Sequence, residues 1–323
     1  IWFWAAAISN GTYILPFPFG KYNKPRGLNK PKKLSLKTVN FKTGTDLNRM
    51  GLEKILEKFP VVKNRVEDEK IVVTMTSFPP ATQYAAQALE SIINGSVLPS
   101  KIVLYLTFSQ FPNSIIPKVL TDLEKKYPLI EIRNYDSDIK SYRKLIPALI
   151  DFPNAVIVTA DDDVQYDKNW LKKLLGTHKL FPKAIIAHRV RKIRTGIPYS
   201  KWKRYKSFRH LLYGPYPKFS NLQVGIGGVL YPPNCLKKEL LKAELFTKIA
   251  PTSDDIWFWA AAVSNGVKIM PVPFGIVTPN ELDKPTEISL HKINMKAISG
   301  KDINLSVFEQ VLEKYPLLKK RVK

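Results

Sequence analysis

The chain has 323 residues, of which 45% are hydrophobic and 11% aromatic, and this composition excludes a disordered chain. Its only cysteine, Cys235, excludes an intrachain disulfide and fits a reducing compartment. The formal net charge of +24 attracts anionic partners such as phosphorylated small molecules, glycans or an anionic membrane surface. No recognisable nucleic-acid-binding module accompanies the basic residues, so we expect no nucleic-acid partner. Basic clusters lie at residues 30–33, 188–194, 201–209 and 319–323.

Sequence segments from the first 66 residues are repeated near the end of the chain. Residues 1–11, IWFWAAAISNG, match residues 256–266, IWFWAAAVSNG, and the match continues to LEKFPVVKNRV at 56–66 and LEKYPLLKKRV at 312–322. A repeat of this length is a domain rather than a solenoid unit. We therefore predict a tandem in which 1–66 is the C-terminal remnant of one domain and 67–323 is a complete second copy. The first residue is not methionine, so we expect a piece of a longer or processed product.

Strands and helices alternate from residue 71 onwards. Ile71–Thr76 is a continuous apolar run that predicts a buried parallel strand, and it ends in a Ser-Phe-Pro-Pro loop. Further strands are expected at residues 101–107, 130–133, 155–159, 184–188, 224–231 and 267–272. Helices are expected at residues 81–94, 114–126, 141–150, 169–175 and 254–265. The alternation predicts an α/β fold with a mostly parallel sheet flanked by helices, and residues 192–221 are expected to be irregular.

Three consecutive carboxylates, Asp161, Asp162 and Asp163, follow the strand expected at 155–159. Ligands bind beyond the carboxyl ends of parallel strands, and the loop at residues 76–80 lies at the same edge. Asp161 and Asp163 point the same way if the segment is extended. A magnesium or manganese ion would relieve their mutual repulsion and hold diphosphate oxygens. The alternative is a solvated turn that caps a helix.

A second acidic pair, Asp254 and Asp255, stands at the head of the apolar helix. Helix capping explains acids at this position, because they suit the N-terminal end of the helix dipole. The functional interpretation makes one of them the general base that takes a proton from an acceptor hydroxyl. The sequence leaves both interpretations open.

Other residues support weaker hypotheses. Gly225, Gly227 and Gly228 in VGIGGVLYPP indicate a bulge or a close approach of backbone to a sugar, and their spacing does not fit a dinucleotide-binding fingerprint. Lys144 is a candidate phosphate contact or an ordinary exposed lysine. Trp257 is a candidate sugar-stacking residue or part of the core.

These motifs together resemble a family of bacterial glycosyltransferases of the GT-A fold, found among surface-polysaccharide and lipooligosaccharide biosynthesis genes. The resemblance is carried by IVVTMTSFPP, KIVLYLT, SYRKLIPAL, VTADDDVQYDKNWL, GIGGVLYPP and TSDDIWFWAAAVSNG, in this order. It covers nearly all of residues 71–275, and 1–66 resembles the tail of the same family. In the family pattern an arginine commonly follows the two prolines, whereas this chain has Ala81.

The resemblance implies a GT-A-like, Rossmann-related fold, a nucleotide-sugar donor and a Mn²⁺ or Mg²⁺ ion at Asp161 and Asp163. With the patterns above, it gives a set of expected site residues. Donor binding is expected of Thr76, Ser77, Pro79, Lys144 and Asp162; acceptor binding of Gly227, Gly228 and Trp257; and base catalysis of Asp254 or Asp255.

The function expected from the sequence is metal-dependent, inverting transfer of a sugar from a nucleoside diphosphate to a glycan or lipid-linked acceptor. We expect the protein in the cytoplasm, at the inner face of the membrane. One alternative is a nucleotidyltransferase, which would usually carry a glycine- and lysine-rich phosphate loop where this chain has SFPPATQ. The other is a non-catalytic glycan- or membrane-binding relative, which Ala81 and the partial repeat leave open.

Overall fold

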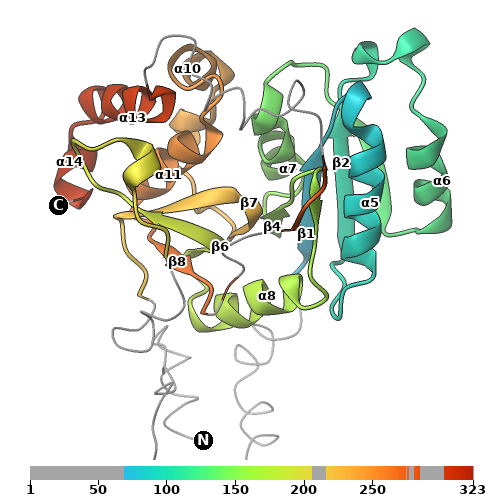
Figure 1. Ribbon diagram of the computed structural model, residues 1–323, viewed down its shortest axis with the longest axis horizontal. Coiled ribbons are helices and arrows are strands. Elements are labelled where there is room, and N and C mark those ends of the chain that lie inside the picture. Colours follow the sequence, from blue (N-terminus) through green and yellow to red (C-terminus); the bar gives the residue numbers. More distant parts are fainter. Residues whose placement is uncertain (1–68, 206–215, 274, 276–279, 284–301, 323) are drawn as a thin grey trace, which may run out of the picture. The chain divides into compact units, whose positions relative to one another are not determined.

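The computed structural model describes residues 69–205, 216–273, 275, 280–283 and 302–322 (Figure 1). Apart from Glu69, these belong to the second of the two units into which the chain divides, Lys70–Lys323. Residues 1–66, predicted to be the remnant of a preceding domain, lie outside the described residues. The tandem arrangement therefore stays a prediction.

A seven-stranded sheet forms the centre of this unit, in the order β3-β2-β1-β4-β7-β6-β8. Its strands are β1 (Ile71–Thr76), β2 (Lys101–Leu106), β3 (Ile130–Asn134), β4 (Val156–Thr159), β6 (Ile185–Lys192), β7 (Asn221–Tyr231) and β8 (Ile269–Pro271). Six of the strands point the same way, and β7 runs antiparallel to both β4 and β6. A separate antiparallel pair joins β5 (Val164–Gln165) to β9 (Asn280–Glu281).

Alternating side chains of the central strands enter two different hydrophobic cores. On β1, Val72 lies in one core, while Val73 and Met75 lie in the other. On β2, Tyr105 shares the core of Val72, and Leu104 lies in the core of Val73. Because both faces of the sheet are buried, these strands are continuous apolar runs rather than alternating ones, as the sequence indicated.

Helices cover both faces of the sheet (Figure 1). One face carries α5 (Thr82–Ile93), α6 (Lys118–Lys126) and α8 (Trp170–Leu180). The other carries α7 (Ile146–Asp151), α10 (Ala243–Ile249), α11 (Asp254–Ser264), α13 (Ile303–Lys314) and α14 (Leu317–Val322). The predicted α/β fold with a mostly parallel sheet flanked by helices is confirmed.

Helix α11 is buried along most of its length and fixes the position of the two acids at its start. Every residue of the segment 256–263 is at most 1% exposed. The indole nitrogens of its tryptophans keep hydrogen bonds, from Trp257 Nε1 to the Leu240 carbonyl at 2.6 Å and from Trp259 Nε1 to the Phe219 carbonyl at 2.8 Å. A helix held by packing on all sides gives the side chains of its first turn a rigid base.

Several predicted element bounds were wrong, and prolines explain two of them. The helix predicted at 114–126 begins only at Lys118, directly after Pro117. The helix predicted at 141–150 is divided into the 3-10 helix η5 (Lys140–Lys144) and α7, because Pro147 in the first turn of α7 has no N–H for a hydrogen bond. The strand predicted at 184–188 continues to Lys192. The sequence patterns did not predict α10, α13 or α14.

Candidate active site

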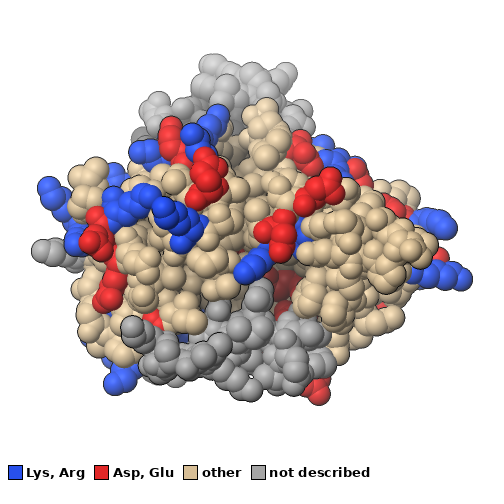
Figure 2. All heavy atoms as spheres, turned by 90° about the horizontal axis from the view of Figure 1, so that it is seen from above, with Lys and Arg blue, Asp and Glu red and all other residues tan. Residues whose placement is uncertain are grey.

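A pocket of about 520 Å³ opens at the carboxyl ends of the parallel strands. Its walls come from segments far apart in the sequence: residues 76–79 after β1, 161–163 after β4, 224–226 in β7 and 252–256 at the head of α11. In the space-filling view, acidic side chains lie around a hollow near the middle of the face, with Lys and Arg side chains beside them (Figure 2). The location is the edge where ligands bind in open α/β sheets.

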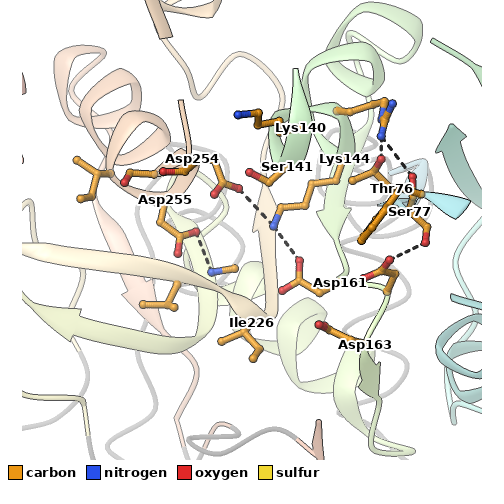
Figure 3. Close-up of a pocket in the computed structure, with 18 of the residues that line it drawn as sticks. Thr76, Ser77, Lys140, Ser141, Lys144, Asp161, Asp163, Ile226, Asp254 and Asp255 are labelled. Carbon is orange, nitrogen blue, oxygen red and sulfur yellow. Dashed lines mark hydrogen bonds and ion pairs between the residues drawn. The ribbon is translucent and has the colours of Figure 1, made fainter. Parts of the chain in front are cut away.

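Lys144 connects the two groups of acids across the pocket. Its Nζ lies 2.8 Å from Asp161 Oδ1 and 3.3 Å from Asp254 Oδ2. Figure 3 shows the lysine side chain between Asp254 on one side and Asp161 on the other. The side chain of Lys144 is only 9% exposed, so water screens these ion pairs weakly.

The backbone and the charge of Lys144 are both held in place. Its carbonyl oxygen accepts a hydrogen bond of 2.5 Å from Thr74 Oγ1 on β1, which fixes the end of η5 to the sheet. Burial alone lowers the pKa of Lys144, but the charges of Asp161, Asp254 and Asp255 together raise it well above its usual value. The ammonium group therefore stays protonated at physiological pH.

Asp255 lies beside the start of β7. The backbone N–H of Gly225 donates to Asp255 Oδ1 at 2.9 Å, and Gln223 Nε2 donates to the Asp255 carbonyl at 3.0 Å. Burial, and next the charge of Asp254, raise the pKa of Asp255 to about 8, although Lys144 lowers it. A carboxyl group with a pKa near neutrality is suited to take and return a proton.

Gly225 leaves the space that this contact needs. A Cβ at this position would lie 2.9 Å from Lys144 Nζ and 3.2 Å from Asp255 Oδ1. Any larger residue would therefore push on both charged groups at once. This is the glycine of the VGIGGVLYPP segment that contributes directly to the pocket.

The loop after β1 is fixed from two directions. Ser77 Oγ donates to Asp162 Oδ2 at 2.5 Å, so the middle aspartate turns toward this loop. The buried guanidinium of Arg143 donates to Thr76 Oγ1 at 2.8 Å, to the Ser77 carbonyl at 3.3 Å and to the hydroxyl of Thr107. These bonds preorganise the segment that lies beside Asp161–Asp163 (Figure 3).

The other two aspartates of the triplet are held through their backbone. The N–H of Asp161 donates to Tyr166 Oη at 2.7 Å, and the carbonyl of Asp163 accepts from the N–H of Leu282 at 2.7 Å. Their carboxylates both line the pocket, where that of Asp161 is paired with Lys144. The helix-capping interpretation does not account for them, since α8 begins only at Trp170.

The structure brings most of the residues expected from the sequence into one pocket. These are Thr76, Ser77, Pro79, Lys144, Asp161, Asp162, Asp163, Asp254 and Asp255. Their gathering places them together but does not test the individual roles assigned to them, which stay predictions.

Three residues expected to bind the acceptor do not line the pocket, and the expectation is corrected here. Trp257 is fully buried in the core. The carbonyl of Gly227 accepts from Trp170 Nε1 at 2.7 Å, and a Cβ on Gly228 would lie 2.6 Å from the Trp170 ring. Both glycines have positive φ, 112° and 93°, so they form a bulge that admits the indole rather than a sugar. Ala81 is also fully buried and does not line the pocket.

Several residues of the pocket wall were not predicted as site residues from the sequence: Arg189, Arg191, Tyr199, Glu281 and Asn304. The two arginines were part of a basic cluster at 188–194, but the strand was predicted to end before them. Side chains two residues apart on a strand point to the same face, so the spacing of Arg189 and Arg191 could have indicated a shared position in the pocket. Glu281 reaches the pocket through the pairing of β9 with β5, for which there was no sequence signal.

Comparisons with known proteins give similarity in fold at low sequence identity. No family model and no curated protein matches the chain. S. aureus TarS 1-349 superposes with a TM-score of 0.43 and 13% identity, covering 76% of this chain and 72% of that chain. GalNAc-T7 with UDP, GalNAc and Mn²⁺ has a TM-score of 0.44 and 15% identity, covering 77% and 50%. CMP:2-keto-3-deoxy-manno-octonic acid synthetase complexed with CTP has 0.41 and 10%, covering 70% and 98%. At these TM-scores the similarities assign no function to the chain.

Membrane attachment was expected only as contact with the surface. Among the described residues, no helix is long and apolar enough to cross a bilayer.

Proposed function

We propose that the protein transfers a sugar from a nucleotide-sugar donor to a hydroxyl group of a glycan or lipid-linked acceptor. The observation that supports this proposal is the arrangement of two clusters of aspartates in one pocket, with Lys144 between them. Asp161 and Asp163 lie on the side of the loop after β1, and Asp254 and Asp255 lie at the head of α11. Such a site can hold a diphosphate on one side and deprotonate a hydroxyl on the other.

The carboxylates of Asp161 and Asp163 fit a divalent metal ion whose remaining ligands come from the substrate and from water. Among the described residues, no group of three or more His, Cys, Asp or Glu side chains could hold a metal ion. Magnesium and manganese at nucleotide sites need only one or two carboxylates, and phosphate oxygens and water complete the shell. Asp161 and Asp163 would supply these carboxylates. When bound, the ion would neutralise the negative charge that develops on the departing diphosphate.

The chain's own residues position the donor. Ser77 and Thr76, fixed by Arg143, present a rigid loop on the donor side of the pocket. Asp162 keeps this loop next to the carboxylates through its bond to Ser77. The permanent positive charge of Lys144 offsets part of the negative charge of the acids, so that an anionic diphosphate can approach them.

Asp255 acts as the general base in this proposal. Its carboxylate accepts the proton of the acceptor hydroxyl while the acceptor oxygen forms a bond to the anomeric carbon of the sugar. The bond from that carbon to the nucleoside diphosphate breaks, and the diphosphate leaves with the electron pair. One base and one displacement invert the anomeric centre. Asp254, paired with Lys144, keeps the base in an electrostatic environment that raises its pKa.

The proposed function also includes a pathway and a cellular location. We place the reaction in bacterial surface-polysaccharide synthesis, with the protein bound peripherally to the inner face of the membrane. The net charge of +24 supports this location, because basic surfaces are attracted to anionic lipid headgroups.

Manganese-dependent hydrolysis of a panel of nucleotide sugars tests the proposal. We expect the protein to release a nucleoside diphosphate from one of them, and we expect this activity to fall at least about 100-fold in Asp163→Asn and in Asp255→Asn. Asp167→Asn, an exposed aspartate beyond the triplet, is the matched control and should retain activity. Full activity in both site variants would exclude the proposed roles.

Two further measurements distinguish the alternative functions. A nucleotidyltransferase would release pyrophosphate from a nucleoside triphosphate when a sugar phosphate is present. A non-catalytic relative would bind a nucleotide sugar or glycan without turnover.

A further inference from the structure

Arg189 is a buried cation in the pocket wall that the protein itself does not fully use. It is 7% exposed, and its Nε has no hydrogen-bond partner among the described residues. It lies near the carboxyl end of β6, at the same edge of the sheet as the segment after β4. Burying a guanidinium without a full set of partners costs free energy of folding, so its presence calls for an explanation.

The surroundings of Arg189 are predominantly positive. Burial lowers its pKa, and so do the neighbouring charges of Arg204 and Arg191. Glu281 is the carboxylate that opposes this effect, together with Tyr199. The part of the pocket around Arg189 thus has an excess of positive charge inside a low-dielectric wall, where an anion is attracted strongly.

Arg191 forms a fixed neighbour to this group. Its Nη1 donates to the carbonyls of Trp202 at 3.0 Å and Tyr199 at 3.3 Å, and its guanidinium stacks on the Tyr199 ring at 4.6 Å. Its Nε, like that of Arg189, has no hydrogen-bond partner among the described residues. These contacts hold Arg191 in place, so its guanidinium is preorganised for a ligand.

Tyr199 lines the same pocket as the two arginines and the proposed base. Burial raises its pKa, the charge of Asp255 raises it further, and Arg191 and Arg189 lower it. The charges of Asp255 and of the two arginines therefore all act on the Tyr199 side chain. A molecule with a hydroxyl group at Asp255 therefore lies in the same pocket as Arg189.

We propose that Arg189 and Arg191 form a subsite for an anionic group, a phosphate or a carboxylate, carried by the acceptor sugar. That the anion belongs to an acceptor sugar rests on the proposed function, whereas the anion site itself does not depend on it. In the proposed function the donor diphosphate occupies the side of Asp161 and Asp163, so the arginines are left for the charged end of the acceptor. The bond is of the charge-assisted kind, in which an arginine fork holds a phosphate or carboxylate.

Calorimetric titration of the full chain tests the subsite at constant ionic strength. The probes are glucose 6-phosphate, glucuronate and inorganic phosphate, with glucose as the neutral control. We expect anionic sugars to bind at least tenfold more tightly than glucose, and Arg189→Met to abolish this preference. The phosphate and carboxylate arms identify which anion the site selects. Arg194→Met, which removes an exposed arginine of the same cluster, should keep it.

The thermal stability of Arg189→Met provides an independent measurement. Without anions, the variant should melt at the same temperature as the wild type or above it, because an incompletely paired buried cation has been removed. Added phosphate should raise the melting temperature of the wild type but not of the variant. An unfolded variant would show that the guanidinium is structural, and unchanged anion binding would exclude the subsite. If the wild type binds the anions through Arg189 but hydrolyses no nucleotide sugar, the proposed function fails and the subsite remains.

Discussion

Lys144 and Asp161 form an ion pair of 2.8 Å that joins the end of η5 to the segment after β4. The same ammonium group lies 3.3 Å from Asp254 on α11. One lysine therefore connects the proposed donor side of the pocket to the acidic pair at the head of α11. Its charge allows several carboxylates to share a small, largely dry volume.

Replacing Lys144 by methionine should destabilise the protein. The change leaves Asp161 and Asp254 facing each other without a counter-charge, and removing one partner of a buried ion pair typically costs about 3 kcal/mol or more. Urea unfolding at pH 7 measures the loss. Lys140→Met is the matched control, because Lys140 is an exposed lysine on the same 3-10 helix and should change the free energy of unfolding by less than about 0.5 kcal/mol. Equal effects of the two variants would contradict the central position of Lys144.

Replacing Asp255 by asparagine should make the protein more stable at high pH. The folded pKa of about 8 lies above the ordinary value of 3.8, so the folded state holds the proton more tightly than the unfolded state. Stability from this group is complete below about pH 4 and is lost as the pH rises through 8. The asparagine variant avoids this loss, so we expect its free energy of unfolding to exceed that of the wild type above about pH 8.

Unfolding curves from pH 5 to 8.5 measure this difference. The gap between the two proteins should widen with pH, whereas Asp167→Asn should follow the wild type at every pH. A constant gap would show that Asp255 ionises at its ordinary pKa. If Asp255 is the base, the kcat/KM of the wild type should rise with pH and level off above about 8.

Gly225→Ala should reduce activity more than stability. The added Cβ meets Lys144 Nζ and Asp255 Oδ1, so both charged groups must shift, and a misplaced base costs about 10- to 100-fold in rate. Gly176→Ala is the control, since Gly176 lies within α8 and a Cβ there meets nothing within 4 Å. That change should stabilise the helix by up to about 1 kcal/mol and leave the rate unchanged. Activity assays and urea unfolding of both variants check the prediction, which an unimpaired Gly225→Ala enzyme would contradict.

Removal of either outer aspartate should weaken manganese-dependent binding of a nucleoside diphosphate. We expect Asp161→Asn and Asp163→Asn each to raise the Kd for UDP in the presence of Mn²⁺ about tenfold or more, with a smaller effect in EDTA. Titration calorimetry with and without the metal measures the difference. An unchanged metal dependence in both variants would show that these carboxylates hold no ion.

The sheet and the main carboxylate positions follow from local sequence patterns. Apolar runs such as Ile71–Thr76 form buried strands because both faces of the sheet are covered. The triplet after β4 then lies at the ligand-binding edge as a consequence of strand direction. The repeat suggested two domains, and that prediction concerns residues outside the described structure.

Which of the remaining candidates face the pocket depends on how the elements pack together. Local sequence did not reveal that Lys144 is buried between two acids, that Gly228 lies against Trp170, or that Trp257 belongs to the core. The arginines of β6 reach the pocket because that strand continues beyond its predicted end. Each of these placements depends on contacts between segments distant in the chain. Sequence patterns report local periodicity, whereas burial and charge pairing arise only when the elements pack together.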